Sequence, residues 1–308
     1  MSEPPLRDIF GNYLVDIGQK NENIVVLDAD LSASTRTIKF AKRFPNRFFN
    51  MGIAEQNMVG TALGFAISGK VPVVSGFSIF TTGRAWEFIR FACHDNLNVK
   101  IITTHSGFVG EDGSTHNALE DLSLMATLPN MEVLVPSDNI ELIEILKYVF
   151  NTKKPSYVRL PRASFPKIHN ENYIFSIGEP DVLKEGNDVC LLGIGYGSIL
   201  AFQSISNIEN ELDISIKVIN LPSLKPINEK SLFNEIKHVN GIVVLEEHNN
   251  YCGFGSIIAR IISKKFAKTI RSLGINNSFG HSGKRDTLLN MYNLNEKELK
   301  KQIKKLII

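Results

Sequence analysis

The chain has little cysteine and almost no net charge, and each shortage excludes a class of protein. Its three cysteines among 308 residues, Cys93, Cys190 and Cys252, lie far apart, which excludes a disulfide framework and a zinc site built on paired cysteines. They fit a reducing compartment. The 34 basic and 32 acidic residues nearly cancel, so charge indicates neither nucleic acid nor an anionic membrane as the main partner.

Long hydrophobic runs are also missing. The N-terminal stretch MSEPPLRD has no apolar segment of the signal-peptide kind, and no uncharged run long enough to span a bilayer is free of glycine and proline. We therefore expect a cytoplasmic protein with no membrane partner. With 43% hydrophobic residues, the chain can bury a full core, and its length favours two medium domains.

Strand and helix patterns alternate along the chain. In the first half, runs typical of buried strands at 24–27, 71–74, 99–103, 132–135 and 157–160 are separated by helical segments. This alternation predicts an α/β fold with a parallel sheet covered on both faces. The proline-containing segment 153–170 interrupts the alternation, so we place a domain boundary near it, and a second strand–helix set follows.

One ionisable side chain, Glu55, interrupts the neutral stretch from Met51 to Gly69. In a helix, this carboxyl shares its face with five apolar residues: Met58, Val59, Ala62, Leu63 and Ala66. A carboxylate removed from water either finds a partner or takes up a proton, and the second outcome raises its pKa toward neutrality. The alternative is a glutamate that offsets the free N–H groups of a helix N-terminus.

Several polar and aromatic segments follow predicted strands. The loop 105–116, HSGFVGEDGSTH, combines two histidines, a glutamate and an aspartate with three glycines, as functional loops do. Phe77 and Phe80 follow the strand at 71–74 and suit either ring stacking or core packing. For Arg159 and Arg162 we expect surface salt bridges, with a phosphate contact as the alternative. The glycine-rich segment 193–198 favours a tight strand-to-helix turn over a dinucleotide loop.

Six short motifs together resemble the C-terminal half of transketolase, in matching order and spacing. They are GIAEQN (52–57), FSIF (77–80), GEDGSTHN (110–117), LPN (128–130), PSD (136–138) and VRLPR (158–162). The resemblance covers nearly the whole chain. It implies a parallel-sheet pyrimidine-binding domain over residues 1–166 and a smaller α/β transketolase C-terminal domain over 178–308.

The resemblance also implies a cofactor, thiamine diphosphate, and roles for named residues. Glu55 would hydrogen-bond the pyrimidine ring and favour the tautomer that takes up the thiazolium proton. Phe80 would stack on the pyrimidine with Phe77 beside it, although Gly83 stands where many transketolases have tyrosine. Asp30 would lie near the cofactor at a subunit interface, and His116 would act in catalysis through the sugar.

Half of the expected cofactor site is missing from the sequence. In the family, a Gly-Asp-Gly motif in the N-terminal domain holds Mg²⁺ and the diphosphate, and this chain contains no such motif. The chain therefore resembles the second subunit of a split transketolase. We expect a partner chain with the Gly-Asp-Gly motif and an α2β2 hetero-oligomer.

The substrates that the resemblance implies are sugar phosphates. Arg7, Ser34, His105 and Arg162 match the family's phosphate-contacting residues, and Asp112 and His116 match residues that contact sugar hydroxyls. The predicted activity is transfer of a two-carbon ketol unit. The alternatives are the β subunit of a 2-oxo acid dehydrogenase, an enzyme like deoxyxylulose-phosphate synthase, or a scaffolding subunit without turnover.

Overall fold

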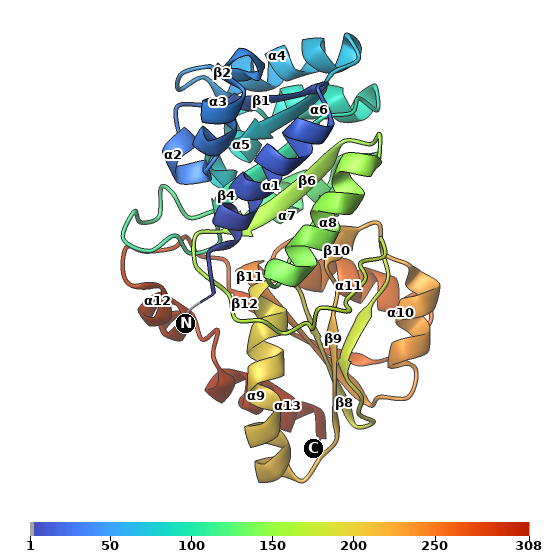
Figure 1. The fold of residues 1–308 in the computed structure, drawn as a ribbon. Coiled ribbons are helices and arrows are strands. Elements are labelled where there is room, and N and C mark those ends of the chain that lie inside the picture. The colour runs from blue at the N-terminus through green and yellow to red at the C-terminus, as the bar shows by residue number, and fades with distance from the viewer. Residues whose placement is uncertain (1–2, 308) are drawn as a thin grey trace.

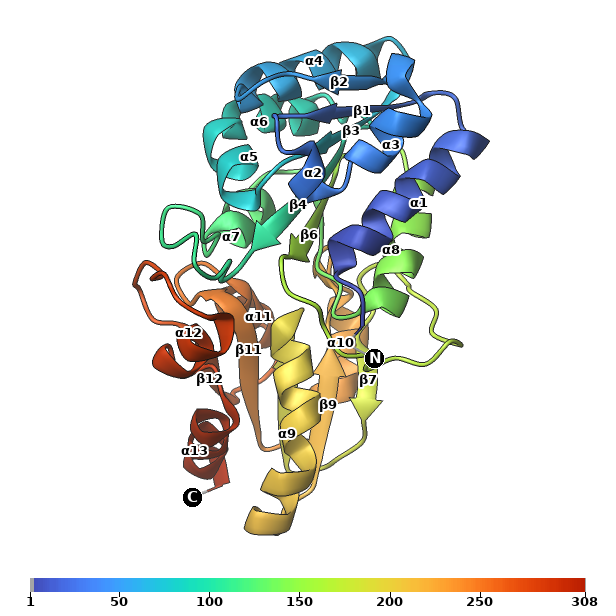
Figure 2. The same cartoon turned by 60° about the vertical axis from the view of Figure 1, so that its left-hand side comes forward.

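The computed structural model describes residues 3–307 and confirms an α/β fold built on two sheets (Figures 1 and 2). The first sheet has seven strands in the order β10-β5-β6-β4-β3-β1-β2. Those from the first half of the chain are parallel, as the alternating pattern predicts. They are β1 (Ile24–Asp28), β2 (Phe48–Asn50), β3 (Val71–Ser75), β4 (Lys100–Ser106), β5 (Glu132–Leu134) and β6 (Ser156–Pro161).

Helices cover both faces of the first sheet. One face carries α1 (Leu6–Lys20), α3 (Ile38–Arg43) and α8 (Asn139–Asn151), and the other carries α4 (Glu55–Ile67), α6 (Trp86–His94) and α7 (Asp121–Ala126). Shorter elements complete this part of the chain: α2 (Ser32–Thr35), η1 (Pro45–Arg47) and α5 (Ser78–Arg84). Helix α8 begins where the Asp138 side chain accepts a hydrogen bond from the Glu141 N–H at 2.9 Å and so caps the helix N-terminus.

The second sheet has the order β12-β11-β8-β9-β7, with only β7 antiparallel to its neighbour. Its strands are β7 (Asp181–Lys184), β8 (Val189–Gly193), β9 (Ile216–Asn220), β11 (Gly241–Asn249) and β12 (Thr269–Ile275). Its helices are α9 (Tyr196–Leu212), α10 (Glu229–Ile236), α11 (Phe254–Ile262), α12 (Arg285–Met291) and α13 (Glu296–Ile307). The segment 193–198 forms the expected turn into α9, and a Cβ on Gly197 would lie 2.0 Å from the Leu245 carbonyl oxygen.

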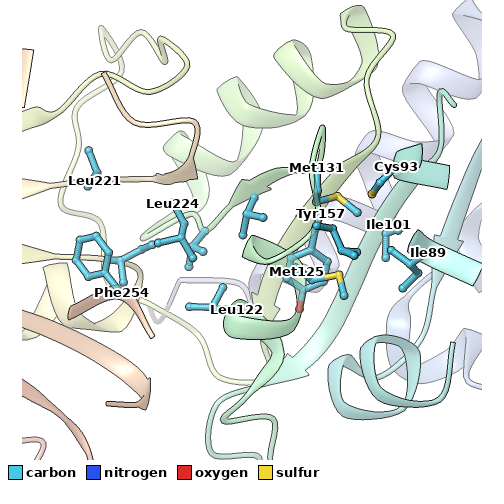
Figure 3. Close-up of a cluster of buried hydrophobic side chains, with 14 of the residues drawn as sticks. Ile89, Cys93, Ile101, Leu122, Met125, Met131, Tyr157, Leu221, Leu224 and Phe254 are labelled. Atoms are coloured by element: carbon cyan, nitrogen blue, oxygen red, sulfur yellow. The ribbon is translucent and has the colours of Figure 1, made fainter. Parts of the chain in front are cut away.

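The two halves of the chain are joined by a shared sheet and a shared apolar core. Strand β10 (Ser223–Lys225) comes from the second half but pairs antiparallel with β5 of the first sheet. One apolar cluster also crosses the junction, because Leu122 and Met125 of α7 lie between core residues of both halves, such as Tyr157 and Phe254 (Figure 3). Each large apolar side chain buried in this way stabilises the fold by roughly 1.5–3 kcal/mol. The junction is therefore packed core rather than a flexible linker.

Among residues 3–307, every helix is too short or too polar to span a bilayer.

Candidate active site

The carboxyl ends of the parallel strands bring most of the predicted site residues to one edge of the first sheet. Ser34 lies in α2 shortly after β1, and Arg162 directly follows β6. Strand β4 continues to Ser106, so His105 lies within this strand and not, as predicted, in the loop after it. A parallel sheet gathers residues that are distant in sequence, which is why ligands bind at this edge in α/β folds.

Glu55 is the first residue of α4, and its side chain is 4% exposed. The helix begins here rather than at Met51, so the carboxyl lies at a helix N-terminus and also beside buried Met58 and Val59. The carboxyl has a partner that the sequence did not reveal, because Arg84 Nη1 donates to both Glu55 oxygens at 2.9 and 3.1 Å. Of the two outcomes expected for a buried carboxylate, the structure shows pairing.

Arg84 contacts a second predicted site residue. Its Cζ lies 4.3 Å from the centroid of the Phe80 ring, a cation–π distance, and its side chain is 49% exposed. The two residues are four apart on α5 and therefore share a helix face. One planar cation thus lies on both the Phe80 ring and the Glu55 carboxyl. Arg84 lies four residues after Phe80, and this helical spacing is the sequence signal that could have indicated that it contacts the Phe80 ring.

Phe77, Phe80, His105 and His116 form one aromatic cluster. Phe77 stacks on His105 with ring centroids 3.8 Å apart, and the two phenylalanine rings stack at 6.1 Å. The rings of His116 and Phe80 meet edge to face, with their centroids 5.1 Å apart. The structure therefore joins the predicted ring-stacking residues to two predicted substrate residues.

Arg7, Ser34 and His105 are joined by hydrogen bonds of Arg7. Its Nη1 donates to the Ser34 carbonyl at 3.2 Å and lies 3.3 Å from His105 Nε2. Burial, together with the positive charges of Arg7 and Arg162, lowers the pKa of His105 to about 3, so the ring is neutral at neutral pH and Nε2 accepts from Arg7. Burial and the charge of Arg36 lower the pKa of Arg7 as well.

The Arg7 side chain has a donor for which a bound anion would supply the acceptor. The Nε of Arg7 is buried and has no hydrogen-bond partner among residues 3–307. A buried N–H without an acceptor is costly, and the charges of neighbouring arginines add to burial in lowering the pKa values of His105 and Arg7. The predicted phosphate residues thus provide donors and a field that fit a phosphate.

A cavity of about 410 Å³ extends from this group to the second domain. Arg7, Arg162, Lys284 and Arg285 all line it. The Arg162 Nη1 donates to Asp112 Oδ2 and to the Val109 carbonyl, both at 2.8 Å, so two predicted substrate residues are paired with each other. The two cations of the C-terminal domain were not predicted, since nothing in the sequence near Lys284 shows that it returns to the first sheet.

The predictions for Asp30 and Arg159 have different outcomes. Asp30 is exposed at the end of β1, where it exchanges hydrogen bonds with Asn50, and its role beside the cofactor stays a prediction. The surface salt bridge expected for Arg159 is wrong, because this residue is 6% exposed and bonds both oxygens of fully buried Asp121 at 2.7 and 3.1 Å. Burial acts to raise the pKa of Asp121, but Arg159 outweighs it and the pKa is lowered.

Relatives named as transketolase sections or subunits match this chain along most of its length. A protein of Methanocaldococcus jannaschii named "Putative transketolase C-terminal section" is 41% identical over 303 residues, covering 97% of this chain and 95% of that protein. The 6-deoxy-6-sulfo-D-fructose transketolase subunit of Clostridium sp. is 31% identical, covering 97% and 93%. An apulose-4-phosphate transketolase subunit of Actinobacillus succinogenes is 34% identical, covering 88% of each chain.

A solved structure and two domain families agree with these relatives. A split-gene transketolase, described as an inactive β4 tetramer, superposes with a TM-score of 0.89 at 39% identity, covering 99% of this chain and 98% of that one. Residues 2–167 match the transketolase pyrimidine-binding domain, and residues 178–299 match the transketolase C-terminal domain. The chain therefore belongs to the transketolase family, as a split subunit made of the pyrimidine-binding and C-terminal domains.

Proposed function

We propose that this chain is one subunit of a thiamine-diphosphate-dependent transketolase that transfers a two-carbon ketol unit between sugar phosphates. Its partner carries the Gly-Asp-Gly domain for Mg²⁺ and the diphosphate, and the pair assembles as α2β2. The observation that carries the proposal is one continuous set of contacts, from Glu55 through Arg84 and Phe80 to His116 and the His105–Arg7 group.

The residues present fit the pyrimidine half of the cofactor. The buried carboxyl of Glu55 and the Phe80 ring, which contact the same Arg84 side chain, offer a hydrogen-bond partner and a stacking surface for a planar heteroaromatic ring. When bound, thiamine diphosphate supplies the nucleophilic carbon that takes up the two-carbon unit. Glu55 would then hold the proton at the pyrimidine nitrogen, Phe77 and Phe80 would orient the ring, and Asp30 would lie near the cofactor at the subunit interface. Arg84 now contacts both Glu55 and Phe80, so it must turn toward solvent to admit the ring.

The substrate's anionic end is assigned to Arg7, Ser34, His105 and Arg162. Neutral His105 keeps one ring nitrogen as an acceptor from Arg7, which leaves the remaining guanidinium N–H groups for oxygen atoms of the ligand. Asp112 and His116 are assigned to sugar hydroxyls nearer the reacting carbon. The names of two relatives, one with a sulfonated sugar and one with a sugar phosphate, support an anionic sugar here.

A substrate panel tests the function. The chain is mixed with its natural partner, Mg²⁺ and thiamine diphosphate, and ketol transfer is measured from ketose phosphates, ketose sulfonates and unphosphorylated ketoses to aldose acceptors. Ketol transfer with anionic sugars supports the proposal. Turnover with 2-oxo acids, or condensation of pyruvate with glyceraldehyde 3-phosphate, would instead identify one of the two related enzyme classes. No turnover with any of them would favour the scaffold.

Replacing Arg162 with alanine tests the phosphate assignment. We expect KM for a phosphorylated acceptor to rise about 10–100-fold, because a hydrogen bond to a charged group contributes roughly 1.5–3 kcal/mol. KM for the unphosphorylated sugar should change much less, since the lost contact is remote from the reacting carbon. Lys167→Ala, which removes a charge paired with exposed Glu171, is the control. An equal penalty for both acceptors would contradict the assignment.

A further inference from the structure

The loop that carries Asp112 and His116 is closed at its neck. Gly107 and Ala118 exchange backbone hydrogen bonds, with N···O distances of 3.0 and 3.2 Å, and we call residues 107–118 the substrate loop. We infer that the C-terminal domain positions this loop through Glu247 and the segment 281–283. The inference rests on the proposed function, and it assigns to the second domain a role in substrate binding.

Glu247, near the end of β11, anchors the neck. Its side chain is 3% exposed, and Oε1 accepts from the Phe108 N–H at 2.9 Å while Arg285 donates to Oε2. The carboxyl lies so near Gly107 that a Cβ there would be 2.6 Å from the Glu247 Cδ. A second bond follows on the other side of the neck, where the Asn249 N–H donates to the Leu119 carbonyl at 2.9 Å. The neck is thus held from the second domain on both sides.

The segment before α12 holds the rest of the loop. Ser282 Oγ donates to the Glu111 carbonyl at 2.8 Å, and the Gly283 N–H lies 3.4 Å from the Gly110 carbonyl. Asn117 Nδ2 donates to the His281 carbonyl at 3.3 Å. Figures 1 and 2 both show the loop after β4 beside the red segment that leads into α12.

The loop needs such anchors because its own backbone is permissive. Gly107, Gly110 and Gly113 all have positive φ (69°, 92° and 81°), a region that glycine enters freely and from which it also leaves freely. A displacement of about 1 Å at a substrate-contacting group can cost 10²-fold in rate. Asp112 lies between Gly110 and Gly113, and His116 lies three residues after Gly113, so the position of both depends on where the second domain holds the loop.

A neighbouring glutamate provides a matched control. Glu246 is also buried (1%) and accepts two backbone N–H bonds, but from Phe254 and Gly255 at the start of α11, inside its own domain. Glu247→Gln and Glu246→Gln therefore make the same chemical change at adjacent positions. In Glu247→Gln, the amide NH₂ meets the Arg285 guanidinium, donor against donor, so the anchor is weakened.

Two measurements are made on both variants. In the chain alone, deuterium uptake of the peptide covering 107–117 should rise at least several-fold in rate for Glu247→Gln and stay at the wild-type level for Glu246→Gln. With the partner present, Glu247→Gln should raise KM for the sugar about tenfold or more, while the dissociation constant for thiamine diphosphate stays unchanged. Ser282 is exposed, so Ser282→Ala should leave folding intact. This variant should also raise the deuterium uptake of 107–117 and KM for the sugar, by less than Glu247→Gln does.

The outcomes separate the inference from the proposed function. Unchanged uptake at 107–117 in both Glu247→Gln and Ser282→Ala overturns the anchoring, and raised uptake with an unchanged KM overturns its role in substrate binding. If Glu247→Gln does not fold, the deuterium uptake of 107–117 and the KM measured for Ser282→Ala decide whether the anchoring and its role in substrate binding hold. Absence of ketol transfer by the wild-type pair overturns the proposed function but leaves the uptake result intact.

Discussion

Replacing Glu55 with glutamine is expected to lower turnover of the two-chain enzyme by more than about 10²-fold, the usual lower bound for losing acid–base help. The amide has nearly the shape of the carboxyl but cannot hold the exchangeable proton at the pyrimidine nitrogen. Folding should survive, because Arg84 is half exposed and can turn to solvent when its partner is lost. Steady-state rates together with a thermal melt of each variant give the comparison.

The ion pair supplies the control for this experiment. Glu55→Gln removes the carboxyl and also breaks the pair with Arg84, whereas Arg84→Gln breaks the same pair and keeps the carboxyl. If the proton is what matters, Arg84→Gln should reduce turnover far less than Glu55→Gln. Comparable losses in both variants would mean that the ion pair, rather than proton exchange, is the important feature. Near-normal turnover by Glu55→Gln would refute the assignment outright.

The sequence predicted the parallel strands well because burial on both faces produces uninterrupted apolar runs. The strand expected at 24–27 is seen at Ile24–Asp28, fully buried, and that expected at 71–74 at Val71–Ser75. Edge elements were missed for the opposite reason. Strand β12 (Thr269–Ile275) is partly exposed, and β10 (Ser223–Lys225) is three residues long, so neither carries a periodic signal.

Side-chain partners were harder to predict than strands. The pair Glu55–Arg84 joins residues 29 positions apart, and Arg159–Asp121 joins residues 38 apart. Spacing rules on one helix or strand do not reach that far, so a buried arginine and a surface arginine look the same in sequence. The anchor at Glu247 is a stronger case, since it lies 139 residues from Phe108 and belongs to the other domain.

Most of the site residues expected from motifs lie close together in the structure. Phe77, Phe80, His105 and His116 lie in one aromatic cluster, and Arg7 contacts both Ser34 and His105. The physical reason is that these residues lie at or just beyond strands of one parallel sheet, except Arg7 and the loop residue His116. The roles of these residues are still proposals, which the variants described above test.

The chain on its own is expected to show no ketol transfer, and addition of its partner should restore it. The sequence contains no Gly-Asp-Gly motif, so the chain by itself offers only the pyrimidine half of the proposed cofactor site. Activity is titrated with increasing partner at fixed Mg²⁺ and thiamine diphosphate and should saturate near equimolar amounts. Robust transfer by the purified chain alone would end the split-subunit proposal.

Two exposed isoleucines, Ile53 and Ile174, provide a test of where the proposed partner binds. Ile53, two residues before Glu55, is 78% exposed, and Ile174, between the two domains in sequence, is 81% exposed. An exposed isoleucine beside the cofactor residues suits burial under a partner chain, and a new charge there would have to be desolvated on association. Ile53→Asp should therefore weaken activation by the partner at least about tenfold in the concentration required, whereas Ile174→Asp should leave it unchanged. Equal activation of both variants would place the partner on another face.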